Sequence, residues 1–283
     1  MSIPAETRAQ VLMQALPYIQ KYHGKIIVIK YGGNAMLSEE LKQAVMGDLT
    51  LLAQIGVRVV LVHGGGPEIT DLMQKTGKEP VFADGLRVTD KETVELVQMA
   101  LAGKVNKDLV NRISLCGGRA IGLCGIDGRM ILAKARDERL GFVGEITDVN
   151  PQPILDMLAA GYIPVVSTVG CGEDGSVYNI NADTAAEHIA GALGAQSLIM
   201  MTDTPGILRE QGKPNTLITE LTVSRAVQLI REGVISGGMI PKTHCCINAI
   251  RRGVERVFII DGRTAHAILI EVLTDEGIGT MFR

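Results

Sequence analysis

Short aliphatic runs alternate with amphipathic stretches along most of this chain of 283 residues. The aliphatic runs are rich in Val and Ile and have the length of buried strands; they are 26–30, 58–62, 162–167, 197–202 and 256–260. The amphipathic stretches have the period of helices; they are 38–55, 91–114, 152–160, 182–195, 222–232, 239–252 and 264–273. Because strands that alternate with helices are joined by crossovers, the pattern predicts an α/β fold with a largely parallel sheet covered on both faces.

One further predicted helix, residues 6–22, precedes the first strand and belongs to no strand–helix unit. Its apolar stripe includes Val11, Leu12 and Leu16. We expect an interruption at Pro17, because the proline ring removes a helical hydrogen bond. Two interpretations remain open: the stripe packs on its own subunit, or it is an assembly element.

The 33 glycines gather just after the aliphatic runs. KYGG at 30–33 follows the first strand, and HGGG at 63–66 follows the second and leads into a helix with Pro67 in its first turn. In open α/β sheets, ligands bind where the carboxyl ends of strands meet the amino ends of helices. The backbone N–H groups of two such turns can hold a phosphate-sized anion between them. The alternative is that the glycines only permit tight left-handed turns.

Four charged side chains stand close to such turns. Lys30 ends a core strand, where an unpaired ammonium is costly, so we expect an anion as its partner. Lys242 begins a helix, an end that disfavours cations unless a negative group offsets them; a solvated surface lysine is the alternative. Asp183 can cap the helix at 182–195, hold the two lysines at a fixed spacing, or do both. Arg87, in DGLRV, has the planar fork that suits a carboxylate.

Three familiar motifs occur here without the context that they need. GCGEDG at 170–175 matches G-x-G-x-x-G but leads into SVYNI and not into a helix, so we predict a hairpin turn. A nicotinamide-dependent dehydrogenase is therefore a weak alternative. HGGG also occurs in esterase oxyanion loops, but no G-x-S-x-G pentapeptide accompanies it. No Gly-Lys pair runs on into Ser or Thr, which excludes a Walker A loop.

Composition narrows the partners and the compartment. The formal net charge is −3 with both signs interspersed, so small molecules or other proteins are expected as partners and nucleic acid is not. Five scattered cysteines without a CxxC pair favour a reducing cytoplasm and no metal site. The aliphatic runs are far shorter than the roughly 18 residues of a membrane span, and MSIPAETR lacks the regions of a signal peptide. We therefore expect a cytoplasmic protein without a membrane segment.

Taken together, the motifs resemble the amino acid kinase family, and within it the members that phosphorylate N-acetyl-L-glutamate in arginine biosynthesis. KYGG alone is weak evidence, but the ordered set extends over about residues 25–282. The set comprises KYGGNAM, VHGGGPEI, DGLRVTD, GKVNKDLV, GFVGEI, YNINADTAA, TDTPGIL, GGMIPK, IIDGR and EGIGTM.

The resemblance implies an open three-layer αβα sandwich with a mostly parallel central sheet. It implies three segments: an oligomerisation helix at 1–24, a lobe for acetylglutamate binding and dimerisation at 25–195, and a lobe for ATP and arginine at 196–283. The reaction would transfer the γ-phosphoryl group of ATP to the side-chain carboxylate, giving N-acetyl-L-glutamyl 5-phosphate and ADP. Mg²⁺ would be held by the ATP phosphates without a dedicated protein site.

The resemblance also implies roles for individual residues. Lys30 and Lys242 would stabilise the transferring phosphoryl group from two sides, and Asp183 would orient both lysines. The phosphates would accept hydrogen bonds from the backbone N–H groups of Gly32, Gly33 and Gly64. The acetylglutamate would be bound by Gly65, Gly66, Arg87 and Asn179, with Arg87 on its α-carboxylate. The nucleotide would be bordered by Thr202, Asp203, Gly206, Ile207, Leu208 and Ser236.

Regulation by L-arginine is a further implication. Arginine-inhibited members of the family carry an extra N-terminal helix that interlaces dimers into a hexameric ring, and a C-terminal segment similar to HAILIEVLTDEGIGTM at 266–281; this chain has both. Because carboxylates pair well with a guanidinium, Glu271 and Glu276 are the candidate contacts of the effector, together with Tyr18. Some relatives bind a PII signalling protein, and the sequence leaves this partner open.

Two other functions stay open on this scaffold. Kinases for carbamate, uridylate or glutamate would share the phosphoryl machinery, but they are not expected to combine DGLRVTD with YNINAD. A non-catalytic arginine sensor would not need both lysines and Asp183. A carboxylate acceptor is already ionised at neutral pH and needs no general base. The lack of a well-placed catalytic histidine therefore favours acylphosphate formation over phosphorylation of an alcohol.

Overall fold

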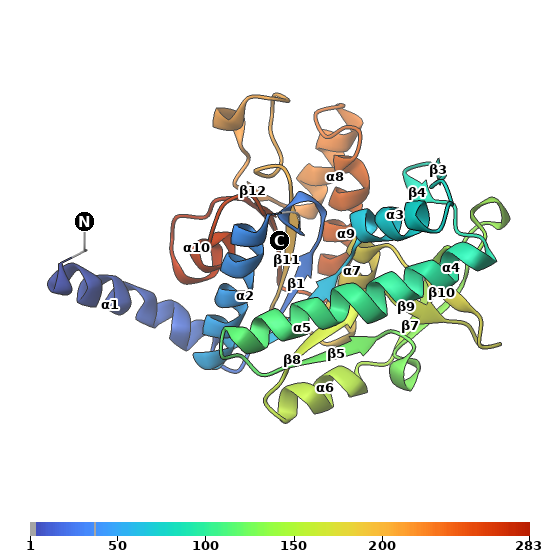
Figure 1. Ribbon diagram of the computed structural model, residues 1–283. Coiled ribbons are helices and arrows are strands. Elements are labelled where there is room, and N and C mark those ends of the chain that lie inside the picture. The colour runs from blue at the N-terminus through green and yellow to red at the C-terminus, as the bar shows by residue number, and fades with distance from the viewer. Residues whose placement is uncertain (1–3, 37) are drawn as a thin grey trace.

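An eight-stranded sheet lies at the centre of the computed structural model, which describes residues 4–36 and 38–283 (Figure 1). Neighbouring strands are parallel except for β13 and β14, so the prediction of a mostly parallel sheet is confirmed. From one edge to the other the strands are β12 (Glu220–Leu221), β14 (Thr280–Phe282), β13 (Arg256–Asp261), β11 (Ser197–Thr202), β1 (Ile26–Tyr31), β2 (Arg58–His63), β8 (Ile163–Ser167) and β5 (Ala120–Cys124).

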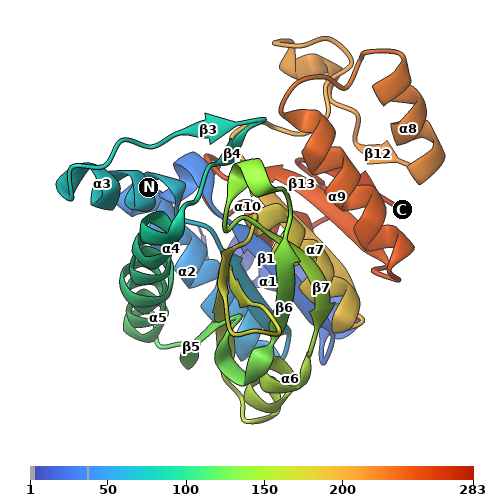
Figure 2. The same cartoon turned by 90° about the vertical axis from the view of Figure 1, so that its right-hand side faces the viewer.

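Both faces of this sheet are apolar. Successive residues of a strand point to opposite sides, and the central strands are apolar over most of their length, so each face receives apolar side chains. In β1, Ile27 and Ile29 join one buried cluster and Val28 joins the other. Helices cover both faces, as Figures 1 and 2 show. One face packs on α2 (Glu39–Gln54), α5 (Asn106–Leu115) and α10 (Ala267–Leu273), and the other on α6 (Gln152–Ala159), α7 (Ala182–Ala192), α8 (Val223–Arg231) and α9 (Met239–Arg251). The predicted three-layer αβα sandwich is confirmed.

Local signals in the sequence explain where several helices begin. The Ser38 hydroxyl accepts a hydrogen bond from the Leu41 N–H at 3.3 Å and caps α2. Pro67 occupies the first turn of α3 (Gly66–Lys75), where its missing N–H costs nothing. The helical stretch predicted at 91–114 is confirmed, and within it the structure distinguishes three consecutive segments: α4 (Lys91–Gln98), the π-helix η2 (Met99–Val105) and α5.

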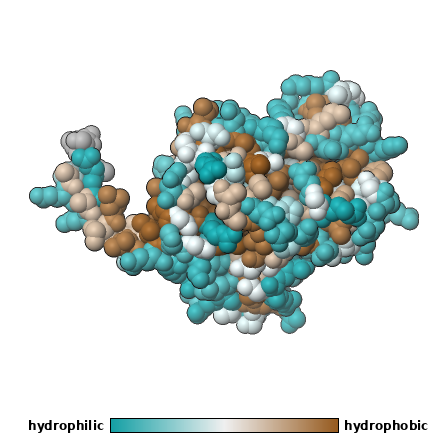
Figure 3. All heavy atoms as spheres, turned by 90° about the horizontal axis from the view of Figure 1, so that it is seen from below, coloured by the Kyte–Doolittle hydropathy of each residue, from teal (hydrophilic) through white to brown (hydrophobic). Residues whose placement is uncertain are grey.

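The first helix, α1 (Ala5–Tyr22), projects from the body of the molecule (Figure 1), and residues 1–3 of the segment predicted at 1–24 lie outside the described residues. Apolar side chains remain exposed on this arm (Figure 3), including Leu12, of which 72% is accessible. The predicted interruption at Pro17 is wrong, because α1 runs through this residue. Proline removes only one helical hydrogen bond, and on an exposed helix solvent can satisfy the freed carbonyl.

A second, smaller sheet has the order β10 (Val177–Asn179), β9 (Val169–Cys171), β6 (Ile131–Ala135) and β7 (Gly144–Val149). The motif at 170–175 ends β9 and forms the turn that leads to the antiparallel strand β10, and the Gly172 N–H donates to the Ser176 carbonyl at 2.7 Å. The hairpin prediction for GCGEDG is confirmed. A short hairpin of β3 (Phe82–Ala83) and β4 (Leu86–Arg87) lies before α4.

The pairing of β1 with β11 joins the two segments that we predict as lobes. Ile27 pairs with Ser197, and Lys30 pairs with Met200. The boundary predicted between 195 and 196 therefore lies beside the middle of one continuous sheet, and the division into lobes stays a prediction.

Candidate active site

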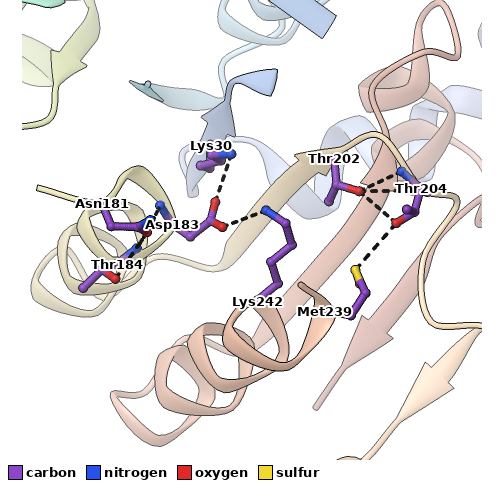
Figure 4. Close-up of polar contacts among 8 residues, drawn as sticks. All are labelled: Lys30, Asn181, Asp183, Thr184, Thr202, Thr204, Met239 and Lys242. Carbon is purple, nitrogen blue, oxygen red and sulfur yellow. Dashed lines mark hydrogen bonds and ion pairs between the residues drawn. The ribbon is translucent and has the colours of Figure 1, made fainter. Parts of the chain in front are cut away.

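Three charged side chains from three elements meet at the carboxyl end of β1 (Figure 4). Lys30 is the last residue but one of β1, Asp183 lies in the first turn of α7, and Lys242 lies in the first turn of α9. Asp183 Oδ1 is 2.9 Å from Lys30 Nζ, and Asp183 Oδ2 is 2.8 Å from Lys242 Nζ. One carboxylate thus holds two ammonium groups that are more than 200 positions apart in the chain, which leaves a net positive charge here.

The protonation states of this cluster follow from its charges. Burial acts to raise the pKa of Asp183, but the two ammonium groups outweigh it and lower that pKa to about 2. Burial acts to lower the pKa of Lys242, but the Asp183 charge outweighs it and raises that pKa. At neutral pH the carboxylate and the Lys242 ammonium are therefore both charged.

The N-cap of α7 is Asn181 and not Asp183, so the Asp183 carboxylate is available to pair with the two lysines. The Asn181 side-chain oxygen accepts from the backbone N–H groups of Asp183 and Thr184 at 3.0 and 3.1 Å (Figure 4). Of the two interpretations of Asp183, the structure therefore supports the one that joins the lysines, and Asn181 supplies the cap.

The two glycine turns lie against each other beside Lys30. A Cβ placed on Gly32 would lie 3.3 Å from Lys30 Nζ and 3.9 Å from the Gly64 nitrogen. Gly33 has a φ of +70°, which favours glycine. The Gly64 N–H donates to the Tyr31 carbonyl at 3.0 Å, so this amide is already engaged and its phosphate contact stays a prediction.

A cavity of ≈ 190 Å³, here called the Arg87 cavity, contains all four residues predicted to bind the acetylglutamate. Its walls include Gly65, Gly66, Arg87 and Asn179. Asn181 and Ala182, the residues just before Asp183, also line it. The sequence thus identified residues from β4, from β10 and from the glycine turn after β2 that the fold brings together in one cavity.

Arg87 is a buried cation in the wall of this cavity. Its Nη2 donates to Thr70 Oγ1 at 2.8 Å and to the Gly66 carbonyl at 3.0 Å, and its guanidinium stacks on Phe82 at 4.9 Å from the ring centroid. Burial lowers its pKa. Within residues 4–36 and 38–283 no carboxylate is close enough to form an ion pair with Arg87. Because a buried charge without a counter-ion is costly, the cavity favours an anionic ligand.

A second cavity, the Met239 cavity, has a volume of ≈ 110 Å³ and lies against the first turn of α9. Four residues predicted for the nucleotide line it: Gly206, Ile207, Leu208 and Ser236. Thr202 and Asp203 do not line it. The Thr202 hydroxyl accepts from the Thr204 N–H at 2.9 Å and shapes the turn after β11 (Figure 4). Asp203 is exposed.

A third cavity, the Glu271 cavity, lies between α1 and the segment around α10 and has a volume of ≈ 500 Å³. Its walls contain Tyr18, Glu271 and Glu276, the three residues predicted to contact arginine. Burial raises the pKa of Glu271, whose Oε2 accepts from the Ile278 N–H at 3.0 Å. The fold therefore brings the two predicted effector segments together.

Comparison with known proteins adds to this geometry. A model of the amino acid kinase family matches residues 25–261. The chain belongs to this family. An acetylglutamate kinase of Brachyspira hyodysenteriae is 54% identical over 283 residues, covering 99% of this chain and 98% of that protein. An acetylglutamate kinase of Clostridium kluyveri is 53% identical over 275 residues, covering 96% and 97%.

Solved structures give the same family fold. The N-acetylglutamate synthase of Neisseria gonorrhoeae, in complex with coenzyme A and N-acetyl-glutamate, superimposes with a TM-score of 0.84 at 26% identity. The match covers 97% of this amino acid kinase chain and 63% of the synthase, so the chain spans less than two thirds of that protein. Carbamate kinase of Giardia lamblia bound to AMP-PNP has a TM-score of 0.69 at 17% identity over 92% of this chain and 98% of its own, a likeness of fold alone.

Some residues at these amino acid kinase cavities were missed from the sequence. Met239 lines the Met239 cavity, and Lys21 and Arg256 line the Glu271 cavity. Met239 lies in GGMIPK, one turn before Lys242, so its position in this motif was a usable signal.

The described residues contain no group of three or more His, Cys, Asp or Glu side chains that could hold a metal ion. None of the helices in the described part of the chain is long and apolar enough to cross a membrane.

Proposed function

We propose that this protein transfers the γ-phosphoryl group of ATP to the side-chain carboxylate of N-acetyl-L-glutamate, in arginine biosynthesis. The observation that carries the proposal is the position of the Lys30–Asp183–Lys242 cluster between two cavities. Residues next to Asp183 line the Arg87 cavity, and Met239, one turn before Lys242, lines the other. The names and high identities of the bacterial relatives support the same reaction.

The two lysines supply what phosphoryl transfer needs most. The transferring group carries negative charge spread over its oxygens, and fixed cations stabilise that charge in the transition state. Lys30 and Lys242 approach from β1 and α9, and so they can contact the group from two sides. Asp183 keeps both ammonium groups in place before the substrates bind, so that little reorganisation remains for the reaction.

The acetylglutamate is proposed to occupy the Arg87 cavity. Its α-carboxylate would become the missing counter-ion of Arg87, and the Asn179 amide would contact its polar groups. The Gly65 and Gly66 amides lie at the amino end of α3, which favours the remaining negative charge. The reacting carboxylate is already ionised at neutral pH, and its lone pair attacks phosphorus without a general base.

The nucleotide is proposed to occupy the Met239 cavity, with its base among apolar side chains and its phosphates directed toward Lys242. The backbone N–H groups of Gly32 and Gly33 would donate hydrogen bonds to those phosphates. Mg²⁺ would be held chiefly by the phosphate oxygens of ATP, which suits described residues that offer no cluster of acidic ligands. Asp183, the carboxylate of the site, is occupied by the two lysines.

A hydroxamate assay with ATP, Mg²⁺ and N-acetyl-L-glutamate tests this function directly. Hydroxylamine traps an acylphosphate, so a coloured hydroxamate is expected with acetylglutamate and not with glutamate or carbamate. A signal with glutamate or carbamate alone would move the assignment to another kinase of the family. Absence of any phosphoryl transfer would support the non-catalytic sensor.

The Glu271 cavity is proposed to bind L-arginine as a feedback inhibitor. Glu220, Glu271, Asp275 and Glu276 place carboxylates around it, against two cations, Lys21 and Arg256. A guanidinium with an α-amino group suits this acidic wall, and Tyr18 offers an aromatic surface from α1. Because α1 also exposes an apolar stripe, we propose that it assembles dimers into a hexamer in the cytoplasm.

Removing residues 1–22 is expected to leave dimers that need roughly tenfold more arginine for half-inhibition, because the Glu271 cavity loses the α1 wall. Light scattering and the hydroxamate assay with added arginine measure the two effects. Leu12→Glu is expected to dissociate hexamers as well, because Leu12 is an exposed apolar residue of α1.

The matched control for this prediction is Gln10→Glu, which places the same charge on the same exposed helix without removing an apolar contact. It is expected to remain hexameric. An intact hexamer with unchanged inhibition after removal of residues 1–22 would contradict both proposed roles of α1.

A further inference from the structure

We propose that His63 and Asn106 are positioning residues that orient the Gly64–Gly65 peptide, so that the Gly65 N–H is presented to an anionic oxygen of the reactants. The inference rests on the proposed phosphoryl transfer. It adds two side chains that hold the second glycine turn, HGGG at 63–66, in position. Neither side chain lines the Arg87 cavity, and both are buried behind the turn.

The two side chains form a buried hydrogen-bonded chain. His63 ends β2 and has no accessible surface, and Asn106 begins α5 with 1% accessible. His63 Nδ1 is 2.9 Å from the Gly64 carbonyl oxygen, and His63 Nε2 is 3.1 Å from Asn106 Nδ2. Asn106 Nδ2 also donates to the Val165 carbonyl at 2.8 Å, which fixes it against β8.

These contacts determine which imidazole nitrogen carries the proton. Asn106 Nδ2 faces two carbonyl oxygens, those of Val165 at 2.8 Å and Leu123 at 3.3 Å, which can only accept, so this atom is the amide nitrogen, and His63 Nε2 at 3.1 Å faces a donor. Asn106 Oδ1 accepts from Lys107 Nζ at 3.1 Å, in agreement with this orientation. The Gly64 carbonyl oxygen, 2.9 Å from His63 Nδ1, can likewise only accept, so Nδ1 carries the proton and donates to it. Burial lowers the pKa of His63 to about 4, so the ring stays neutral at assay pH.

Fixing the Gly64 carbonyl fixes the next amide. In a trans peptide the C=O and the following N–H point in opposite directions, and the structure contains no cis peptide among its described residues. The carbonyl points toward His63, so the Gly65 N–H points away from it. No described residue accepts a hydrogen bond from this N–H, and Gly65 lines the Arg87 cavity.

The π-helix η2 packs directly against the same glycine turn. A Cβ placed on Gly65 would lie 2.7 Å from Leu101 Cδ2 and 3.2 Å from Val105 Cγ2, so any larger residue would collide with η2. The wider turn of η2 ends immediately before Asn106. Single π-turns inside helices occur frequently at functional sites. Here η2 packs against Gly65, and the segment that follows it supplies the partner of His63.

One internal competitor for the Gly65 N–H is present. Glu68 occupies the third position of α3, from which a carboxylate can reach back to the amide before the helix. Glu68 Oε2 is buried and has no hydrogen-bond partner among the described residues. The competing arrangement would be a capping contact from Glu68, and the experiment below must separate it from ligand binding.

Two replacements of His63 separate positioning from packing. In His63→Asn the amide nitrogen can take the place of Nδ1 and still donate to the Gly64 carbonyl, so kcat is expected to stay within about fivefold of wild type, the equivalent of one lost hydrogen bond. His63→Gln places its nitrogen one bond further away, and kcat is expected to fall by about 10²-fold, as when one oriented donor is lost. The apparent KM for ATP is expected to change little in both.

A structural control accompanies these variants. Thr50→Val removes a buried hydrogen bond to the Met46 carbonyl on α2, away from the turn, and is expected to lower the melting temperature without lowering kcat. Equal losses of kcat in His63→Asn and His63→Gln would overturn the proposal. So would a kcat in His63→Gln equal to that of wild type.

Two NMR readouts on the unmodified protein do not depend on the variants folding. The ¹⁵N spectrum of the imidazole ring is expected to show His63 protonated on Nδ1; protonation on Nε2 would overturn the proposal whether or not acetylglutamate is the substrate. In ¹⁵N-glycine protein, the Gly65 amide is expected to shift when AMP-PNP and acetylglutamate are added together. An unshifted amide would assign this N–H to Glu68 and refute its role in the site. Failure of the proposed function itself would appear separately, as a wild-type protein that forms no hydroxamate.

Discussion

Lys242→Ala is expected to lower kcat by about 10³-fold, the scale of effect seen when a fixed group that stabilises a transferring phosphoryl is removed. Lys242 approaches the cluster from α9, whereas Lys30 approaches from β1, so neither ammonium can take the other's place. Loss of Lys242 also leaves one Asp183 oxygen without a cation and removes the net positive charge of the cluster, which attracts the incoming phosphates. Lys30→Arg is expected to lose activity on a similar scale, because the planar guanidinium cannot occupy the position of a compact ammonium.

Single-turnover measurements with saturating ATP and acetylglutamate report the phosphoryl-transfer step, and circular dichroism verifies the fold. Lys134→Ala is the matched control, because Lys134 also pairs with a carboxylate, Glu145 at 3.7 Å, but on the exposed small sheet. It is expected to keep full activity. A near-normal kcat in Lys242→Ala or Lys30→Arg would remove the catalytic role from that lysine.

Arg87→Lys is expected to raise the KM for acetylglutamate by about 10²-fold and to leave the KM for ATP nearly unchanged, since a bidentate, desolvated contact with a carboxylate is lost. The lysine keeps the charge but not the fork, and it can no longer stack flat on Phe82 or donate to both Thr70 and Gly66. The effect therefore tests geometry and not only charge.

Steady-state kinetics with each substrate varied in turn measure this effect. Arg119→Lys is the matched control, because the Arg119 guanidinium also stacks on an aromatic ring, at 4.5 Å from the Tyr162 centroid, outside the three cavities. An equal rise in both KM values for Arg87→Lys would indicate a general disturbance of the site. No rise in either would exclude Arg87 as the carboxylate ligand.

The sequence predicted the central strands well because both faces of the sheet are buried. A strand such as β1 then reads as an unbroken aliphatic run that ends in Lys30, and the length of the run marks the strand. The edge strand β12 and its neighbour β14 were not predicted, since each has only two or three residues and the two pair with each other across about 60 residues of chain.

The sequence predicted which residues form the candidate site, but it did not predict all the contacts among the residues that support it. Lys30 lies at the carboxyl end of a strand, Asp183 and Lys242 lie in the first turns of helices, and a parallel sheet brings such positions to one edge. The contact of His63 with Asn106 left no comparable signal, because it depends on the extra backbone of η2, and the period of a helix changes too little over one wide turn to be visible in a sequence.

The place of β1 in the sheet also has a consequence for synthesis of the protein. β1 is the first strand to leave the ribosome, but its neighbour β11 follows some 165 residues later. At translation rates of about 5–20 residues per second this leaves β1 as an unpaired edge for roughly ten seconds or more, long enough for aliphatic strands of neighbouring nascent chains to pair with it. A chaperone that covers this edge would protect the growing chain, and the two lysines of the cluster cannot meet until α9 has been made.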